Sequence, residues 1–103
     1  MTPATRTLIV RPDDTDLQVE KGATEAWWLE LDWSRQLPGD TLSSSTWESL
    51  DNLPVGTPAF TDDRSSTMIS GGNFGDCYRL KNTVVTVAGE TFTRQVRVDV
   101  TRE

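Results

Sequence analysis

The sequence predicts an all-β protein, an antiparallel β-sandwich of about seven short strands. Apolar and polar residues alternate with period two in several segments, the pattern of strands with one buried face and one solvated face. Glycine, proline, asparagine and aspartate separate these segments at close spacing, as turn residues do. No window of ten or more residues shows the i, i+3, i+4, i+7 apolar spacing of an amphipathic helix.

Length, charge and cysteine content limit the possible functions. A chain of 103 residues has room for one domain. Ten basic and sixteen acidic residues give a net charge of −6, which argues against nucleic acid and anionic membranes as partners. The single Cys77 cannot form an internal disulfide, and no segment has the length and apolarity of a signal peptide or membrane span. We therefore expect a soluble protein that folds in a reducing cytoplasm.

The first 24 residues are predicted to form an arm with one or two short edge strands. The apolar and β-branched run at residues 7–10 indicates one strand, closed by Pro12. An acidic turn follows at residues 13–16, without the residue spacing of a calcium loop. Leu17 and Val19 suggest a second strand, which we expect to end in a turn at Lys21 and Gly22.

A tryptophan-rich stretch, residues 25–47, begins the sandwich, which we place at residues 25–103. It holds all four tryptophans of the chain. From residue 27 to residue 33 the odd positions are apolar and predicted to face the core, which makes this a central strand. The even positions, predicted to face outward, are Trp28, Glu30 and Asp32. Pro38 and Gly39 then end the strand in a turn.

The rest of the chain reads as further short strands and turns. A polar strand is expected at residues 41–47, an irregular crossing or short edge strand at 50–60, a polar turn at 62–66 and a compact strand at 67–70. A hairpin over residues 77–100, turning at Ala88 and Gly89, should be the most regular part. The predicted core residues are Trp27, Leu29, Leu31, Trp33, Trp47, Tyr78, Leu80, Val84, Val96 and Val98.

This order of strands favours a sandwich of immunoglobulin-like type. Tyr78 follows the turn at Gly75 and Asp76, where a tyrosine corner would place its hydroxyl against nearby backbone. Because Cys77 has no disulfide partner within the chain, packing must close the core.

Catalytic and metal-binding patterns are missing from the sequence. There is no histidine, the commonest general base and metal ligand. Gly71, Gly72 and Gly75 lack the lysine and the following helix of a phosphate-binding loop. Glu30 and Asp32 would share one strand face, but such a pair is usually solvated. We predict no enzymatic activity, no cofactor and no metal.

Trp28 is the residue of greatest functional interest in the tryptophan stretch. It shares the outward face with Glu30 and Asp32, so it is either an anchor for a partner or covered by a neighbouring loop. The pattern alone supports both interpretations equally.

Several ordered motifs resemble the small structural proteins of tailed bacteriophages known as fiber-tail adaptors. Those chains carry an L-D-W-S strand, an L-x-x-D-T-I step, an S-S-T-W strand, an L-S-G-G turn, a Y-x-V-x-N strand and a closing hairpin. The matching segments are Leu31-Asp32-Trp33-Ser34, Leu37 with Asp40-Thr41-Leu42, Ser45-Thr46-Trp47, Ile69-Ser70-Gly71-Gly72, Tyr78-Arg79-Leu80-Lys81-Asn82, and Ala88-Gly89 with residues 96–100. The resemblance covers about two thirds of the chain, roughly residues 30–100. Before Trp27 the short lead-in of those proteins is replaced by a longer stretch.

The resemblance implies an immunoglobulin-like domain, present in several copies at the neck or tail of a virion, that links a fiber or appendage to the particle. Its partners would be other virion proteins of the neck, portal-proximal region, tail or fiber, and copies of itself. It would be made in the host cytoplasm. The expected interface residues are Trp28, Glu30, Asp32, Leu8, Ile9 and Val10. The alternatives are a capsid decoration or head-fiber protein and, from another class, a carbohydrate-binding module.

Overall fold

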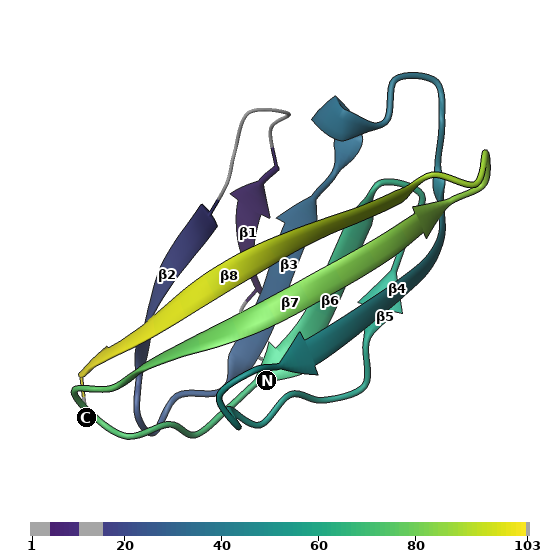
Figure 1. Ribbon diagram of the computed structural model, residues 1–103. Helices are drawn as coiled ribbons and strands as arrows, with labels where there is room; N and C mark the ends of the chain where they lie inside the picture. Colours follow the sequence, from purple (N-terminus) through teal and green to yellow (C-terminus); the bar gives the residue numbers. More distant parts are fainter. Residues whose placement is uncertain (1–4, 11–15, 103) are drawn as a thin grey trace.

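The computed structural model describes residues 5–10 and 16–102 and shows two β-sheets packed face to face (Figure 1). The predicted all-β sandwich is therefore confirmed. In chain order the elements are β1 (Thr5–Ile9), β2 (Asp16–Gly22), β3 (Trp27–Asp32), the 3-10 helix η1 (Ser34–Gln36), β4 (Leu42–Ser49), β5 (Ala59–Phe60), β6 (Arg64–Ile69), β7 (Cys77–Thr86) and β8 (Thr91–Arg102).

Each sheet has four strands. Sheet A has the order β1-β3-β6-β5, and sheet B has the order β2-β8-β7-β4. Both sheets are mixed, because β1 pairs parallel with β3 and β2 pairs parallel with β8, while the other pairs are antiparallel. The sequence predicted about seven antiparallel strands. The two parallel pairs come from the arm, whose pairing partners sequence alternation cannot show.

The N-terminal arm contributes one edge strand to each sheet. β1 lies at the edge of sheet A beside β3, and β2 lies at the edge of sheet B beside β8 (Figure 1). Residues 13–15 of the predicted acidic turn, and Pro12, fall outside the described residues. The turn predicted at Lys21 and Gly22 is wrong, because both residues belong to β2 and the chain turns immediately after them.

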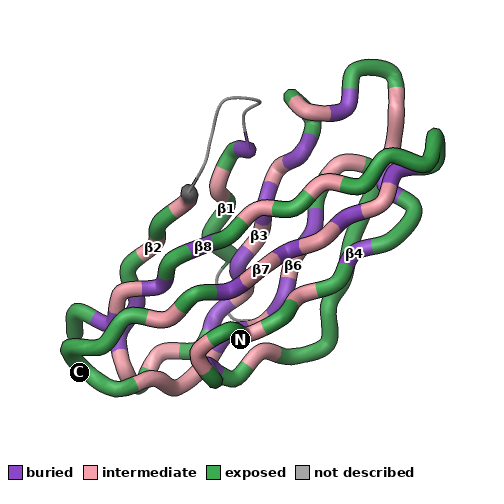
Figure 2. The backbone as a smooth tube through the Cα atoms, viewed as in Figure 1, coloured by how far each residue is buried: buried purple, intermediate pink, exposed green. Residues whose placement is uncertain are grey.

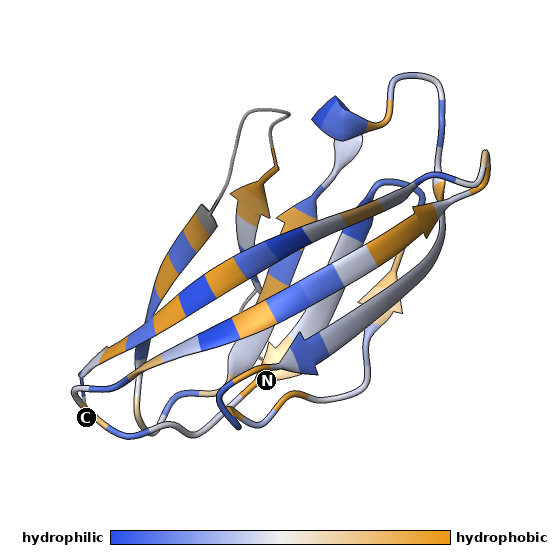
Figure 3. Ribbon diagram, viewed as in Figure 1, coloured by the Kyte–Doolittle hydropathy of each residue, from blue (hydrophilic) through white to orange (hydrophobic). Residues whose placement is uncertain are grey.

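Buried residues alternate with more exposed ones along the strands (Figure 2), and hydrophobic residues alternate with hydrophilic ones (Figure 3). This alternation places the apolar residues of both sheets between the layers. The buried apolar residues are Val10, Trp27, Leu29, Leu31, Trp33, Leu37, Leu42, Leu53, Ile69, Leu80, Val84, Val96, Val98 and Val100. Trp47 and Tyr78 are only partly buried and pack against this cluster. The Tyr78 hydroxyl accepts a hydrogen bond of 2.9 Å from the backbone N–H of Asn73, as a tyrosine corner would.

A buried polar network joins the two sheets inside this core. The indole N–H of Trp33 donates to Ser65 Oγ and to Asn82 Oδ1, both at 3.1 Å. Ser65 donates to Asn82 Oδ1 at 2.6 Å, and the Asn82 amide donates to Ser45 Oγ at 3.2 Å. Ser65 belongs to β6, so the polar turn predicted at residues 62–66 extends too far. Ser65 is buried in the core because its hydroxyl has partners there.

Candidate interaction surface

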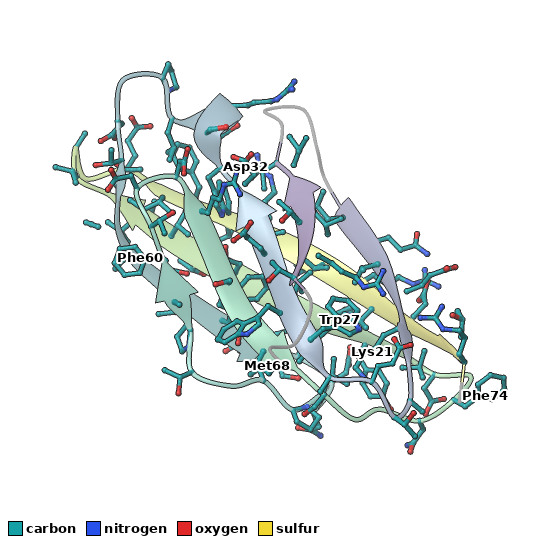
Figure 4. The ribbon with its side chains drawn as sticks, turned by 180° about the vertical axis from the view of Figure 1, so that it is seen from behind. Lys21, Trp27, Asp32, Phe60, Met68 and Phe74 are labelled. Atoms are coloured by element: carbon teal, nitrogen blue, oxygen red, sulfur yellow. The ribbon has the colours of Figure 1, made fainter. Side chains whose placement is uncertain are left out.

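The outer face of sheet A carries an apolar pair. Trp28 on β3 and Met68 on β6 are directly opposed neighbours in the antiparallel register, and both are half-buried. Trp28 also lines a shallow depression together with Thr5, Glu30, Ala59 and Ser66, contributed by β1, β3, β5 and β6. In the view from behind, Met68 lies on the exposed side of sheet A (Figure 4). We call Trp28, Met68 and the residues of this depression the sheet A patch.

Charged side chains surround Trp28 and Met68 on the same face. Arg64 Nη1 lies 3.2 Å from Glu30 Oε1, and Arg64 Nη2 lies 3.9 Å from Asp32 Oδ2. The Thr7 hydroxyl donates to Glu30 Oε1 at 2.8 Å. Partial burial raises the pKa of Asp32, but hydrogen bonds from Ser34 and the charge of Arg64 outweigh it and leave that pKa below its usual value. The two carboxylates predicted to point outward are therefore ion-paired rather than merely solvated.

The three arm residues predicted at the interface differ in exposure. The side chain of Ile9 is 41% exposed and shares the outward face with Asp32, its neighbour in the β1–β3 pair. Leu8 is half-buried and packs against the core, and Val10 is fully buried within it. The strand alternation of β1 separates these residues, so a partner docking on sheet A would meet Ile9 first.

The outer face of sheet B is built differently. Arg97 Nε lies 2.7 Å from Asp99 Oδ1, and Arg79 Nε lies 3.1 Å from Asp51 Oδ2. Arg79 and Arg97 are cross-strand neighbours, so each arginine has a carboxylate that offsets their mutual repulsion. Cys77, exposed at the start of β7, belongs to this polar face.

Sequence reasoning missed Met68 and Arg64 as surface residues. The turn predicted at residues 62–66 hid their common parity, although Arg64, Ser66 and Met68 alternate with the buried Ser65, Thr67 and Ile69. It also missed the exposed phenyl rings of Phe60 and Phe74, which are 45% and 57% exposed. Each lies in a segment without periodicity, where sequence gives no orientation.

Two ionisable residues lie at the end of the sandwich where β2 leads into β3. Lys21 is fully buried, and its ammonium donates to the carbonyls of Gly22 and Gly71 at 2.7 and 2.6 Å. Burial lowers the pKa of Lys21, against the opposing effect of Glu25. Glu25 accepts hydrogen bonds from the backbone N–H of Gly22 and from Arg102, which lower its pKa to about 2. These contacts tie β2 to the loop after β6 and to β8.

Within residues 5–10 and 16–102, no group of three or more cysteine and carboxylate side chains is placed to hold a metal ion. The same part of the chain contains no helix that is long and apolar enough to cross a membrane.

A solved structure shares the fold at low sequence identity. A 2,6-sialyltransferase from Photobacterium sp. JT-ISH-224, solved with CMP and lactose, superposes with a TM-score of 0.56 and 13% identity over 88% of this chain. The match spans only 19% of that enzyme, so it shows the fold alone. A cysteine protease inhibitor from Entamoeba histolytica gives a TM-score of 0.46 and 10% identity, over 91% of this chain and 94% of its own.

Sequence comparison identifies the family. No curated protein sequence matches the chain. A family model described as podophage GP4 fiber-tail adaptor protein gp77 matches residues 21–99. That span runs from the end of β2 to near the end of β8 and includes Trp28, Met68 and their ion-paired neighbours. The chain therefore belongs to the family of podophage fiber-tail adaptor proteins.

Proposed function

We propose that this protein is a non-enzymatic adaptor of the virion that links a fiber or appendage to the neck or tail, and that it docks through the sheet A patch. Membership of the fiber-tail adaptor family supports the role of a phage structural protein. The proteins on either side would be neck, portal-proximal, tail or fiber proteins, joined after synthesis in the host cytoplasm.

The observation that carries the choice of surface is the pairing of Trp28 with Met68 on the outside of sheet A. Tryptophan and methionine are enriched at protein interfaces, where an aromatic anchor contributes much of the binding energy. Arg64, Glu30 and Asp32 stand beside this pair and would form a polar rim. Ile9, on the arm strand next to β3, would extend the apolar area.

The polar outer face of sheet B supports the same choice by contrast. Its arginines are already paired with carboxylates of the same chain, so a partner would have to replace those contacts. Exposed ion pairs of this kind contribute little energy and are screened by salt. Docking on sheet A would instead bury an aromatic ring and a thioether.

The test places one negative charge on each face of the sandwich. Met68→Glu alters the sheet A patch, and Thr83→Glu is the matched control, because Thr83 is half-buried on the outer face of β7. We expect Met68→Glu to be depleted at least about tenfold from purified particles, since a charge at an interface centre costs several kcal/mol. Thr83→Glu should be incorporated like the unchanged chain. Quantitative mass spectrometry of particles provides the measurement.

Equal incorporation of both variants would refute docking through the sheet A patch, and particles lacking the unchanged chain would refute the adaptor role. Copy number decides the position in the particle. A dozen or fewer copies, seen by electron microscopy at the neck or tail, would support an adaptor. Hundreds of copies on the capsid would instead show a decoration or head-fiber protein.

A further inference from the structure

The free edge of β4 differs from the other sheet edges. β1, β5, β2 and β4 are the edge strands. β5 has two residues, β1 has five, and β2 carries Asp16, Glu20 and Lys21 among its seven residues. Short length and charge discourage edge-to-edge pairing. β4 has eight residues, LSSSTWES, and Glu48 is its sole ionisable residue. Its register shift lies between Leu42 and Ser44, so the ladder is regular from Ser44 to Ser49.

The hydrogen-bond register shows which groups of β4 face outward. The N–H of Leu50, directly after β4, donates to the Arg79 carbonyl at 2.9 Å, in register with the β4–β7 pair. Bonded pairs alternate in an antiparallel ladder, so Thr46 and Glu48 bond to β7. The N–H and C=O groups of Ser45, Trp47 and Ser49 therefore point away from β7.

The neighbouring connection, residues 51–58, forms its backbone hydrogen bonds with β6 and the residue after it rather than with this row of groups. The N–H of Gly56 donates to the Met68 carbonyl, and the carbonyl of Pro54 accepts from Ser70. Within the described residues, no backbone hydrogen bond from outside sheet B reaches Ser45, Trp47 or Ser49. Three successive positions at spacing i, i+2, i+4 thus form an open template for another strand.

Two buried polar atoms on the same strand also lack a partner among the described residues. They are the indole nitrogen Nε1 of Trp47 and the hydroxyl Oγ of Ser49. Buried polar groups are nearly always hydrogen-bonded in folded proteins. Both side chains share the inward parity of Ser45 and are enclosed by the chain itself, so an added strand would contact the backbone of β4 and not these two atoms.

We propose that β4 pairs with β4 of a second copy, antiparallel about a two-fold axis, to join two B sheets into one. With Trp47 opposite Trp47 of the second copy, Ser45 lies opposite Ser49 and Thr46 opposite Glu48. This register aligns every outward-pointing backbone group with its counterpart, as an antiparallel ladder requires.

Charge and symmetry favour a second copy as the occupant. A two-fold interface must be self-complementary. The run from Leu42 to Trp47 meets this condition because it carries no charge that would repel its own copy. The pairing puts each Glu48 beside Thr46 rather than beside the other Glu48. Within its own copy, Glu48 has Lys81 as its cross-strand neighbour, which reduces repulsion between two chains of net charge −6.

The test uses the full-length chain and two opposite substitutions at Thr46, whose exposed side chain faces outward. Thr46→Lys would meet Glu48 of the second copy twice per dimer, and Thr46→Glu would oppose it twice. We expect the dissociation constant of the dimer to be about fivefold lower with lysine and about fivefold higher with glutamate. Sedimentation equilibrium gives the dissociation constants. Ser49→Pro, which removes one outward N–H but no bond to β7, should weaken the dimer at least about tenfold.

Circular dichroism should show that all three variants are folded. A chain that stays monomeric at every concentration would overturn the proposal, as would Thr46 variants that shift the constant in the same direction. A monomeric chain whose Ser45, Trp47 and Ser49 amides become protected from hydrogen exchange only in particles would assign the edge to a strand of another protein, and would also overturn it. None of these outcomes depends on the sheet A patch.

Discussion

The two outer faces of the sandwich follow the same alternation and both carry ion pairs, but only sheet A adds an apolar pair of large side chains. On sheet A the outward residues of β3 and β6 place Trp28 beside Met68, with Glu30, Asp32 and Arg64 around them. On sheet B the outward residues form intramolecular ion pairs centred on Arg79 and Arg97. Strand period therefore decides which residues leave the core, while the identity of those residues decides whether a face is apolar or charged.

The largest change in the free energy of unfolding should come from substituting the adjacent tryptophans that point to opposite sides of sheet A. Trp27 is buried, with its indole 4.9 Å below the Arg6 guanidinium, and Trp28 is half-buried on the outer face. Trp27→Ala should lower the free energy of unfolding by about 4 kcal/mol, because it empties a core position. Trp28→Ala should cost about 2 kcal/mol, because its ring is only partly buried and lies on the outer face rather than in the core.

Urea unfolding followed by circular dichroism measures both values. Docking through sheet A requires that Trp28 contribute little to the stability of the fold. Equal losses for the two variants would show that Trp28 is a structural residue, and the sheet A patch would lose its anchor.

The third region to compare is the end of the sandwich that holds Glu25, which should give the protein's stability a dependence on pH. The backbone N–H of Gly22 and the Arg102 guanidinium lower the pKa of Glu25 to about 2, below the value of about 4.3 expected in the unfolded chain. A depressed folded pKa stabilises the protein fully above the unfolded value. This contribution should be lost as the pH falls from about 4.3 toward about 2.

Glu25→Gln should flatten the pH dependence of unfolding in that window, measured by urea titrations at several pH values. Arg102→Gln should raise the Glu25 pKa, observed by carbon-detected NMR, while leaving the Gly22 contact in place. A Glu25 carboxyl that titrates at its ordinary value would contradict the contacts at this end.

The smallest effects are expected from the ion pairs themselves. Arg64→Gln on sheet A and Arg97→Gln on sheet B each remove a guanidinium that is about half exposed. Each should change the free energy of unfolding by about 0.5 kcal/mol, because exposed ion pairs are weak. Thermal unfolding at low and high salt measures these changes in the free energy of unfolding. A loss above about 2 kcal/mol for Arg64→Gln would mean that Arg64 holds the strands of sheet A together rather than lying at the border of the sheet A patch.

The regular strands were predictable because each has one buried and one exposed face. Alternation located β3, β7 and β8 and the orientation of Trp27 and Trp28. It failed at Lys21, which follows the apolar parity of β2 as a buried ammonium. That ammonium is satisfied by the carbonyl of Gly71, fifty residues away in the chain, and no local pattern reveals such a partner.

The candidate surface was predictable only in part. Trp28, Glu30 and Asp32 all belong to β3, so the alternation of that one strand places them on the same face. Met68 belongs to β6 and joins them only through the β3–β6 register. Register across strands depends on the whole sheet, and a single sequence gives it poorly. The arm residues illustrate the same limit, because Val10 enters the core only through the placement of β1 beside β3.

The parallel pairing of β2 with β8 has a consequence for the order of folding. Leu17 lies beside Val96, so β2 has its ladder partner in a strand that follows it much later in the chain. Contacts between such distant segments slow folding, because the loop between them must close before they are formed. The pairing of β1, β3 and β6 in sheet A and of β4 with β7 in sheet B does not require β8, whereas β2 joins sheet B only through β8. Until β8 is available, β2 has no ladder partner within sheet B.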